Sequence, residues 1–162
     1  MYPDTEMFGY LGSGQPVYDR YNSHNHVAIR SILLEALSWI RLNGEQFAVE
    51  EVEFGRVVGE TTCVRTSESD AIVFAQRPRR FGLTRFVLGR KPEPSSKMVV
   101  ILKKAEDGDY YVLISAFVGA RAEPEPWDRN ATEKSVEFWS THALVWGSEP
   151  VAPGTETRVC PW

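Results

Sequence analysis

A run of basic residues between positions 77 and 91 has the clearest chemical meaning in the sequence. The segment, RPRRFGLTRFVLGRK, contains no acidic residue and holds a third of the chain's 18 basic residues. These are Arg77, Arg79, Arg80, Arg85, Arg90 and Lys91. Guanidinium groups bind phosphate through paired N–H donors, and the nearby rings of Phe81 and Phe86 are of a type that stacks on bases. The run predicts a site for RNA phosphate or another anionic ligand, unless its arginines pair with the acidic residues of the segment 45–53.

Two hydroxyl groups and one histidine extend this candidate site. If residues 83–88 form a strand, alternation places Thr84 on one face and Arg85 on the other. Ser115 is a lone hydroxyl in an apolar run, where it would hold a phosphate or bond a neighbouring carbonyl. His142 follows an expected helix and precedes an apolar run. That position suits proton transfer, or alternatively a histidine bonded to the backbone.

The segment EPEPWD, residues 123–128, offers a second kind of chemistry. Its three carboxylates could bind a cation or act as acid and base. Alternatively, they cap the following helix and pair with Arg121 or Arg129. His24 and His26 stand two residues apart at a helix start, where side chains do not face each other. The sequence has no CxxC pair, HExxH, GxSxG or P-loop, so we expect neither a metal site nor a cofactor.

Composition limits the kinds of protein this chain can be. Its 162 residues fit one domain with a sizeable core. The net charge of -4 argues against a protein that coats nucleic acid non-specifically. Two distant cysteines, Cys63 and Cys160, do not make a disulfide framework. Asp4 and Glu6 near the start, and the lack of an apolar stretch of ~20 residues, predict a cytoplasmic protein with no signal peptide and no membrane contact.

The segment from Lys97 to Gly119 organises the elements that would position these side chains. Two runs rich in β-branched and aromatic residues flank the turn sequence AEDGD, which predicts a long hairpin. Four shorter strand-like runs precede it and are separated by turn residues. They cover residues 47–54, 60–66, 71–76 and 83–88. This spacing is typical of a mostly antiparallel sheet.

Two helices are expected beside the sheet. An apolar stripe from Ile29 to Ile40, with Ser23 as the cap and Asn43-Gly44 as the end, predicts a helix of about five turns. A short last helix would begin near Asn130, with Asn130 or Thr132 as its cap. Residues 1–22 are expected to form an irregular arm, and residues 147–162 an extended tail. The predicted fold is therefore α+β, a long N-terminal helix on a mostly antiparallel sheet, in a single domain spanning residues 1–162.

This order of elements, with a basic strand and the hairpin MVVILKK…YYVLISAF, resembles the barnase–EndoU–colicin–RelE class of small ribonucleases. The resemblance covers roughly residues 47–119. It implies cleavage of RNA without a metal, with the 2′-hydroxyl as nucleophile. By position, the resemblance implies that Arg77, Arg80 and Arg85 stabilise the phosphorane and that Ser115 holds the phosphate. His142, outside the matched stretch, would transfer the proton.

Our leading interpretation is an RNA phosphate-binding domain with metal-independent ribonuclease-like activity. Its catalytic residues would be His142, Arg80 and Arg85, and its substrate-binding residues Arg77, Thr84 and Ser115. The main alternative is a non-catalytic, homodimeric interaction protein, because tyrosine and tryptophan favour interfaces. Its contact surface would combine the tryptophan-rich C-terminal part with the aromatic residues of the arm: Tyr2, Phe8, Tyr10, Tyr18 and Tyr21. A third interpretation is a small-molecule enzyme that uses Glu123, Glu125 and Asp128.

Overall fold

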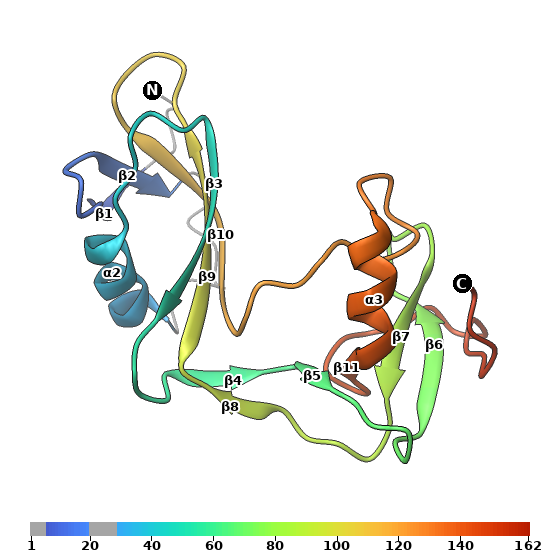
Figure 1. The fold of residues 1–162 in the computed structure, drawn as a ribbon. Coiled ribbons are helices and arrows are strands. Elements are labelled where there is room, and N and C mark those ends of the chain that lie inside the picture. Colours follow the sequence, from blue (N-terminus) through green and yellow to red (C-terminus); the bar gives the residue numbers. More distant parts are fainter. Residues whose placement is uncertain (1–5, 20–28) are drawn as a thin grey trace. The chain divides into compact units, whose positions relative to one another are not determined.

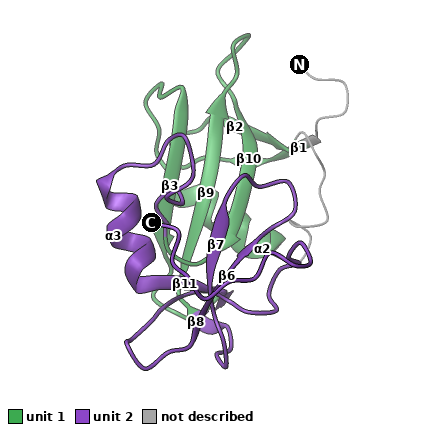
Figure 2. Ribbon diagram, turned by 90° about the vertical axis from the view of Figure 1, so that its right-hand side faces the viewer, with its two compact units in different colours: residues 1–59, 95–120 green, residues 60–94, 121–162 purple. Residues whose placement is uncertain are grey.

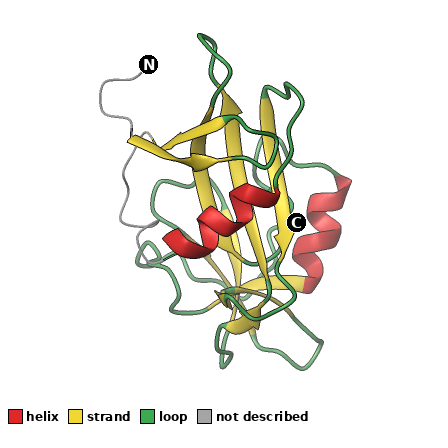
Figure 3. Ribbon diagram, turned by 90° about the vertical axis from the view of Figure 1, so that its left-hand side faces the viewer, coloured by secondary structure: helices red, strands yellow, loops and turns green. Residues whose placement is uncertain are grey.

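Strands make up most of the regular structure (Figure 1 and Figure 3). The computed structural model describes residues 6–19 and 29–162. Strand accounts for 37% and helix for 13%, so the predicted α+β class is wrong and the fold is mostly β. Contacts divide the chain into two compact units, residues 1–59 with 95–120 and residues 60–94 with 121–162 (Figure 2). The single domain expected for residues 1–162 stays a prediction.

Unit 1 is built on a five-stranded sheet with the strand order β1-β2-β10-β9-β3. The strands are β1 (Glu6–Tyr10), β2 (Pro16–Asp19), β3 (Phe47–Glu53), β9 (Lys97–Lys104) and β10 (Tyr111–Val118). The β9–β10 pair is the hairpin expected from the sequence, and β3 pairs antiparallel with β9. β2, however, runs parallel to β10. The sheet is therefore mixed, and the expectation of a mostly antiparallel sheet is wrong.

The core of unit 1 lies between this sheet and the helix α2 (Arg30–Trp39). Alternate residues of β9, Met98, Val100 and Leu102, are buried together with Leu37 of the helix. These residues share one face of the strand, while Val99 between them is buried outside this core cluster. The hairpin therefore supplies the surface on which the helix packs.

The helix α2 has 10 residues, so the long N-terminal helix that we expected is wrong for the described residues. Its expected cap, Ser23, lies outside them. The helix ends early because Gly12 binds its C-terminal end. The Gly12 N–H donates to the Leu37 and Ile40 carbonyls, at 3.0 and 2.8 Å. A side chain on Gly12 would collide with the helix backbone. Ile40 continues the apolar stripe in an extended conformation and is still buried.

The described part of the N-terminal arm is ordered into strands, where we expected irregular structure. Residues of β1 and β2 and of their connection enter the core: Phe8, Leu11 and Val17 are buried. Tyr10 is exposed, whereas Tyr2 and Tyr21 lie outside the described residues. The arm thus contributes to the core of unit 1, and the homodimer stays a prediction.

Unit 2 contains a four-stranded sheet with the order β5-β11-β7-β6. The strands are β5 (Cys63–Arg65), β6 (Ile72–Gln76), β7 (Leu83–Val87) and β11 (His142–Val145). β7 and β11 are parallel, and the other neighbours are antiparallel. Phe86 and Val87, adjacent on β7, belong to different apolar clusters. Because neighbouring residues of a strand point to opposite faces, apolar groups pack on both faces of this sheet.

The short last helix, α3 (Glu133–Thr141), leads directly into β11. Thr132, one of its two expected caps, accepts a hydrogen bond from the Lys134 N–H and forms a capping box with Ser135. The tail 147–162 attaches to β6 without forming a regular element. Phe74 and Thr157 exchange two backbone hydrogen bonds of 2.8 Å, so the tail extends the free edge of β6.

Two short strands, β4 (Gly59–Thr61) and β8 (Glu93–Ser95), pair with each other. They lie in sequence where the chain passes from one unit to the other, and β4 with β5 divides the single strand expected over residues 60–66. Neither α2 nor α3, the helices of the described residues, has the length and apolar character needed to cross a membrane.

Candidate functional site

The turn between β6 and β7 carries three of the predicted basic residues. Its backbone closes with a hydrogen bond from the Arg80 N–H to the Arg77 carbonyl, 3.2 Å long. Pro78 follows Arg77, and Arg79 has a φ of 65°. Proline second and a positive φ third are the features of a type II turn, whose third position normally holds glycine. The arginine therefore sits in a backbone conformation that L-residues adopt at a cost of ~1 kcal/mol.

A second segment, residues 125–130, meets this turn. It is ordered by its own carboxylate: the Asn130 N–H donates to the Asp128 side chain at 2.8 Å. The Trp127 ring packs on Gly82, where an added Cβ would come within 2.2 Å of the ring. Only glycine leaves room for this contact. The close approach holds the two segments together across 45 residues of sequence.

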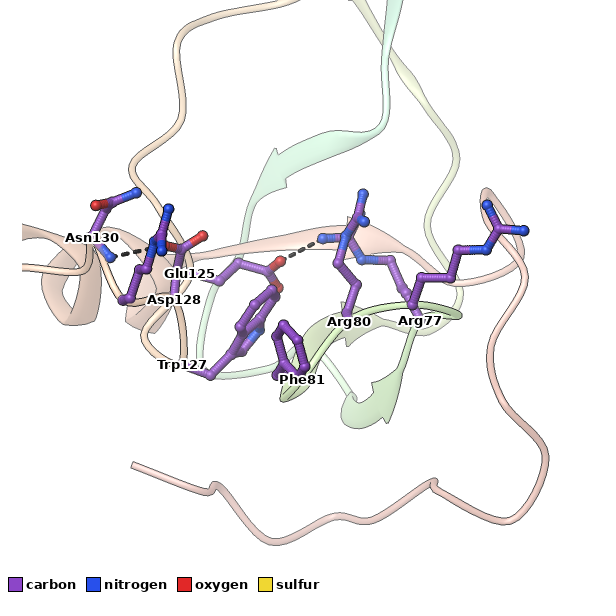
Figure 4. Close-up of a pocket in the computed structure, with 9 residues that line it drawn as sticks. Arg77, Arg80, Phe81, Glu125, Trp127, Asp128 and Asn130 are labelled. Atoms are coloured by element: carbon purple, nitrogen blue, oxygen red, sulfur yellow. Dashed lines mark hydrogen bonds and ion pairs between the residues drawn. The ribbon is translucent and has the colours of Figure 1, made fainter.

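Turn and segment together line a pocket of about 770 Å³ (Figure 4). The lining residues are Arg77, Arg79, Arg80, Phe81, Glu125, Trp127, Asp128, Arg129 and Asn130. Four guanidinium groups face two carboxylates, so the pocket has an excess of positive charge in a protein of net charge -4. Such local positive potential attracts anions.

Arg77 is the one pocket arginine held by acceptors on three sides within the described residues. Its Nη2 pairs with the buried Glu125 carboxylate, drawn as a dashed line in Figure 4. Its Nη1 lies 2.9 Å from Glu149, and its Nε donates to the Thr84 hydroxyl at 3.1 Å. The structure therefore brings the predicted substrate-binding residues Arg77 and Thr84 together. Arg77 and Thr84 are hydrogen-bonded to each other, and Arg77 also pairs with two carboxylates. These interactions fix the position of Arg77 in the pocket lining.

The other three pocket arginines, Arg79, Arg80 and Arg129, are exposed. None of their guanidinium groups has an ion-pair or hydrogen-bond partner within residues 6–19 and 29–162. Beside them Phe81 is 96% exposed, more than any other large apolar side chain in the described part of the chain. Three unpaired cations and a bare aromatic ring thus share one pocket.

The remaining basic residues of the run point elsewhere. The Arg85 Nη1 donates to the Thr66 hydroxyl at 2.8 Å and to the His142 carbonyl at 3.0 Å, and burial lowers the pKa of this guanidinium. Arg90 pairs with Asp70 and Glu93 at 3.1 and 3.0 Å. Lys91 is exposed and does not line the pocket. The predicted cluster is therefore divided, and only its first three arginines line the pocket.

The other two predicted site residues also lie outside the pocket lining. The His142 ring stacks on Phe138 at 4.0 Å, and its Nδ1 lies 3.0 Å from the Phe138 carbonyl oxygen. The Thr141 Oγ1 also lies 3.0 Å from Nδ1, so this nitrogen can donate to the Phe138 carbonyl or accept from the Thr141 hydroxyl. Ser115 belongs to β10 of unit 1, next to a bulge in the hairpin. His24 and His26 lie outside the described residues.

The acidic segment shows no sign of a metal site, since no group of three or more metal-binding side chains occurs among the described residues. Glu125 instead faces Cys63 as well as Arg77: burial and the nearby Glu125 charge raise the pKa of the Cys63 thiol to about 11. This thiol is therefore protonated and a poor nucleophile at neutral pH.

Sequence reasoning missed two contributors to the pocket. Arg129 was assigned only a pairing role, and Trp127 none. The Trp127 Nε1–H is buried and has no hydrogen-bond partner in the described part of the chain. The only sequence signal for these two residues was a tryptophan followed by Asp-Arg-Asn after a proline-rich segment. That signal does not reveal that Trp127 contacts Gly82, 45 residues away.

Comparisons of this chain with protein-family models, curated proteins and solved structures found no match.

Proposed function

We propose that this protein binds RNA at the pocket between the segments 77–81 and 125–130, with phosphates held by Arg79, Arg80 and Arg129. The observation that carries the proposal is the gathering of three exposed, unpaired guanidinium groups around one pocket of an acidic protein. Like charges repel one another, and a bound anion would relieve this repulsion. Guanidinium groups match the oxygens of a phosphate through paired donors.

Two unfavourable local features at the same pocket support this proposal. Arg79 holds a positive φ, and the Trp127 Nε1–H is buried without a partner among the described residues. Strained backbone and unsatisfied polar groups are concentrated at binding sites, where they are maintained for function. The Arg77–Glu125 pair then acts as the support that fixes the wall.

The test is binding of a fluorescein-labelled, single-stranded RNA oligonucleotide, measured by anisotropy over a range of salt concentrations. Three phosphate contacts predict that log K falls with log salt with a slope of about -2, because a single strand gives ~0.7 per contact. Arg80→Gln and Arg129→Gln should each reduce the slope by about 0.7 and weaken binding about fivefold, as expected for one exposed ion pair of ~1 kcal/mol. Arg158→Gln, an exposed arginine outside the pocket, is the matched control.

Arg79→Gly separates binding from folding. Glycine suits the positive φ of Arg79, so the unfolding free energy should be unchanged or rise by up to about 1 kcal/mol. RNA binding should nevertheless weaken as in the other two pocket variants. The proposal is refuted if wild-type protein shows no salt-dependent RNA binding, or if all three pocket variants bind like Arg158→Gln.

Cleavage is a further part of this proposal, and the resemblance to small ribonucleases motivates it. His142 and Arg85 do not line the pocket, so cleavage requires that the bound RNA extend from Arg80 to these two residues, where His142 would accept the 2′-hydroxyl proton and Arg85 would stabilise the phosphorane. The measurement is RNA cleavage in EDTA by wild type and by His142→Asn. Cleavage that His142→Asn abolishes would agree with the proposal. Intact RNA after incubation with wild type would remove the catalytic part and leave binding in place.

A further inference from the structure

The side chain of Phe81 is presented to solvent by a rigid backbone. Two hydrogen bonds fix the turn before it, from the Arg80 N–H to the Arg77 carbonyl and from Gln76 Nε2 to the Arg80 carbonyl. Gly82, which follows it, packs on Trp127. The ring therefore stands on a backbone anchored at both ends, although nothing in the described chain covers it.

The surroundings of Phe81 indicate what could cover it. Figure 4 shows the phenyl ring beside Trp127, with the Arg80 side chain near it. The ring thus combines an apolar face with adjacent unpaired cations. An apolar peptide side chain would use the ring but not the guanidinium groups. A nucleotide uses both, because its base stacks on the ring and its phosphates bind the cations.

The size of the pocket agrees with such a ligand. Its volume of about 770 Å³ is within the range of roughly 300–1,000 Å³ found for small-molecule sites, which accommodates one nucleotide and its flanking phosphates. A base inside a duplex is stacked on both faces and cannot reach a side-chain ring. An unpaired base can, which is why proteins use aromatic side chains on single strands.

From these contacts we infer that the ligand of the pocket is single-stranded RNA, with one unpaired base stacked on Phe81 and the flanking phosphates on Arg79 and Arg80. This inference rests on the proposed function and adds the class of substrate to it. In this complex the guanidinium groups contribute the part of the RNA affinity that depends on salt concentration. The Phe81 ring contributes a part that does not depend on salt.

The test compares Phe81→Leu with Phe81→Trp in the same anisotropy assay. Leucine keeps an apolar side chain and removes the π-face, so binding should weaken about 5-fold to 100-fold with an unchanged salt slope. Tryptophan keeps the face and should bind within about threefold of wild type. Because Phe81 is 96% exposed, both variants should melt at the wild-type temperature, which thermal unfolding checks.

Two nucleic-acid controls complete the experiment. A blunt duplex of the same sequence should bind at least tenfold more weakly, and Phe81→Leu should not alter that residual binding. This inference would be overturned if duplex and single strand bound equally, or if Phe81→Leu bound RNA with wild-type affinity. Weaker binding by Arg80→Gln in the same assay would show that the proposed function still holds. Absence of binding to every RNA form would instead overturn the proposed function on which it rests.

Discussion

Removing the guanidinium group of Arg77 gives the sharpest test of how the pocket is built. Arg77→Met keeps much of the side-chain volume and leaves the Glu125 carboxylate without its cation. The Glu125 side chain is only 9% exposed, and that of Arg77 is 18% exposed. Leaving a buried charge unpaired costs about 3–5 kcal/mol. Because some water reaches Arg77, we expect the lower end, about 3 kcal/mol.

Two further variants separate the contributions to this loss. Glu149 also pairs with Arg77, but its side chain is 42% exposed, so Glu149→Gln should cost only about 0.5 kcal/mol. The double variant Arg77→Met/Glu125→Met removes both charges and fills their place with apolar groups. Such replacements are often close to neutral, so the double variant should recover to within about 1 kcal/mol of wild type.

Urea unfolding followed by tryptophan fluorescence measures these differences, because the signal reports mainly on unit 2. Four of the five tryptophans lie there: Trp127, Trp139, Trp146 and Trp162. With an m value of ~1.5 kcal/mol/M, a loss of about 3 kcal/mol lowers the unfolding midpoint by about 2 M. A loss in Arg77→Met no larger than that in Glu149→Gln would refute the reasoning, since Glu125 would then be solvated.

Two remaining predictions concern the thiols and the glycine of the pocket. At pH 8 Ellman's reagent should titrate the exposed Cys160 at once and Cys63 at least a hundredfold more slowly, because the Cys63 pKa of about 11 leaves ~0.1% thiolate. The slow rate should rise tenfold per pH unit up to about pH 11, and a pH-independent slow phase would contradict this. Gly82→Ala should lower stability by about 1–3 kcal/mol in urea unfolding, because its Cβ would overlap Trp127. Gly82 does not have a positive φ, so the loss would come from the contact with Trp127, and wild-type stability of Gly82→Ala would argue against that contact.

Elements specified by neighbouring residues were predictable from the sequence. The hairpin β9–β10 follows from two alternating runs around a turn, and its register buries Met98, Val100 and Leu102 as the pattern indicates. The short helix α3 likewise follows from a local capping signal at Thr132. In both cases the decisive interactions join residues close in sequence.

Elements specified by distant residues were not predictable. The apolar stripe of α2 continues to Ile40, but the helix stops because Gly12 binds its last carbonyl groups. The arm looked irregular because the short β1–β2 pair joins the sheet only where β2 pairs in parallel with β10, more than 90 residues away. No local pattern of Val17 or its neighbours shows that pairing. The mixed sheet and the short helix have the same cause.

The candidate site shows the same division. Arg77, Arg79 and Arg80 line one pocket because they share one turn. Arg85 diverges from them because it follows Thr84 on a strand, and successive side chains point to opposite faces. Arg129 enters the pocket from a distant segment and could not be placed there from the sequence.

The charged side chains that line the pocket are of two kinds, those with a partner and those without one in the described part of the chain. The pocket's two carboxylates already have partners, since Glu125 pairs with Arg77 and Asp128 accepts the Asn130 N–H. The charge of Glu125 is therefore balanced by Arg77, whereas the partner of Asp128 is an uncharged N–H and leaves the charge of that carboxylate in place. Because one arginine satisfies the buried acid, the three exposed guanidinium groups keep no carboxylate partner within the described residues, which is the basis of the anion site that we propose.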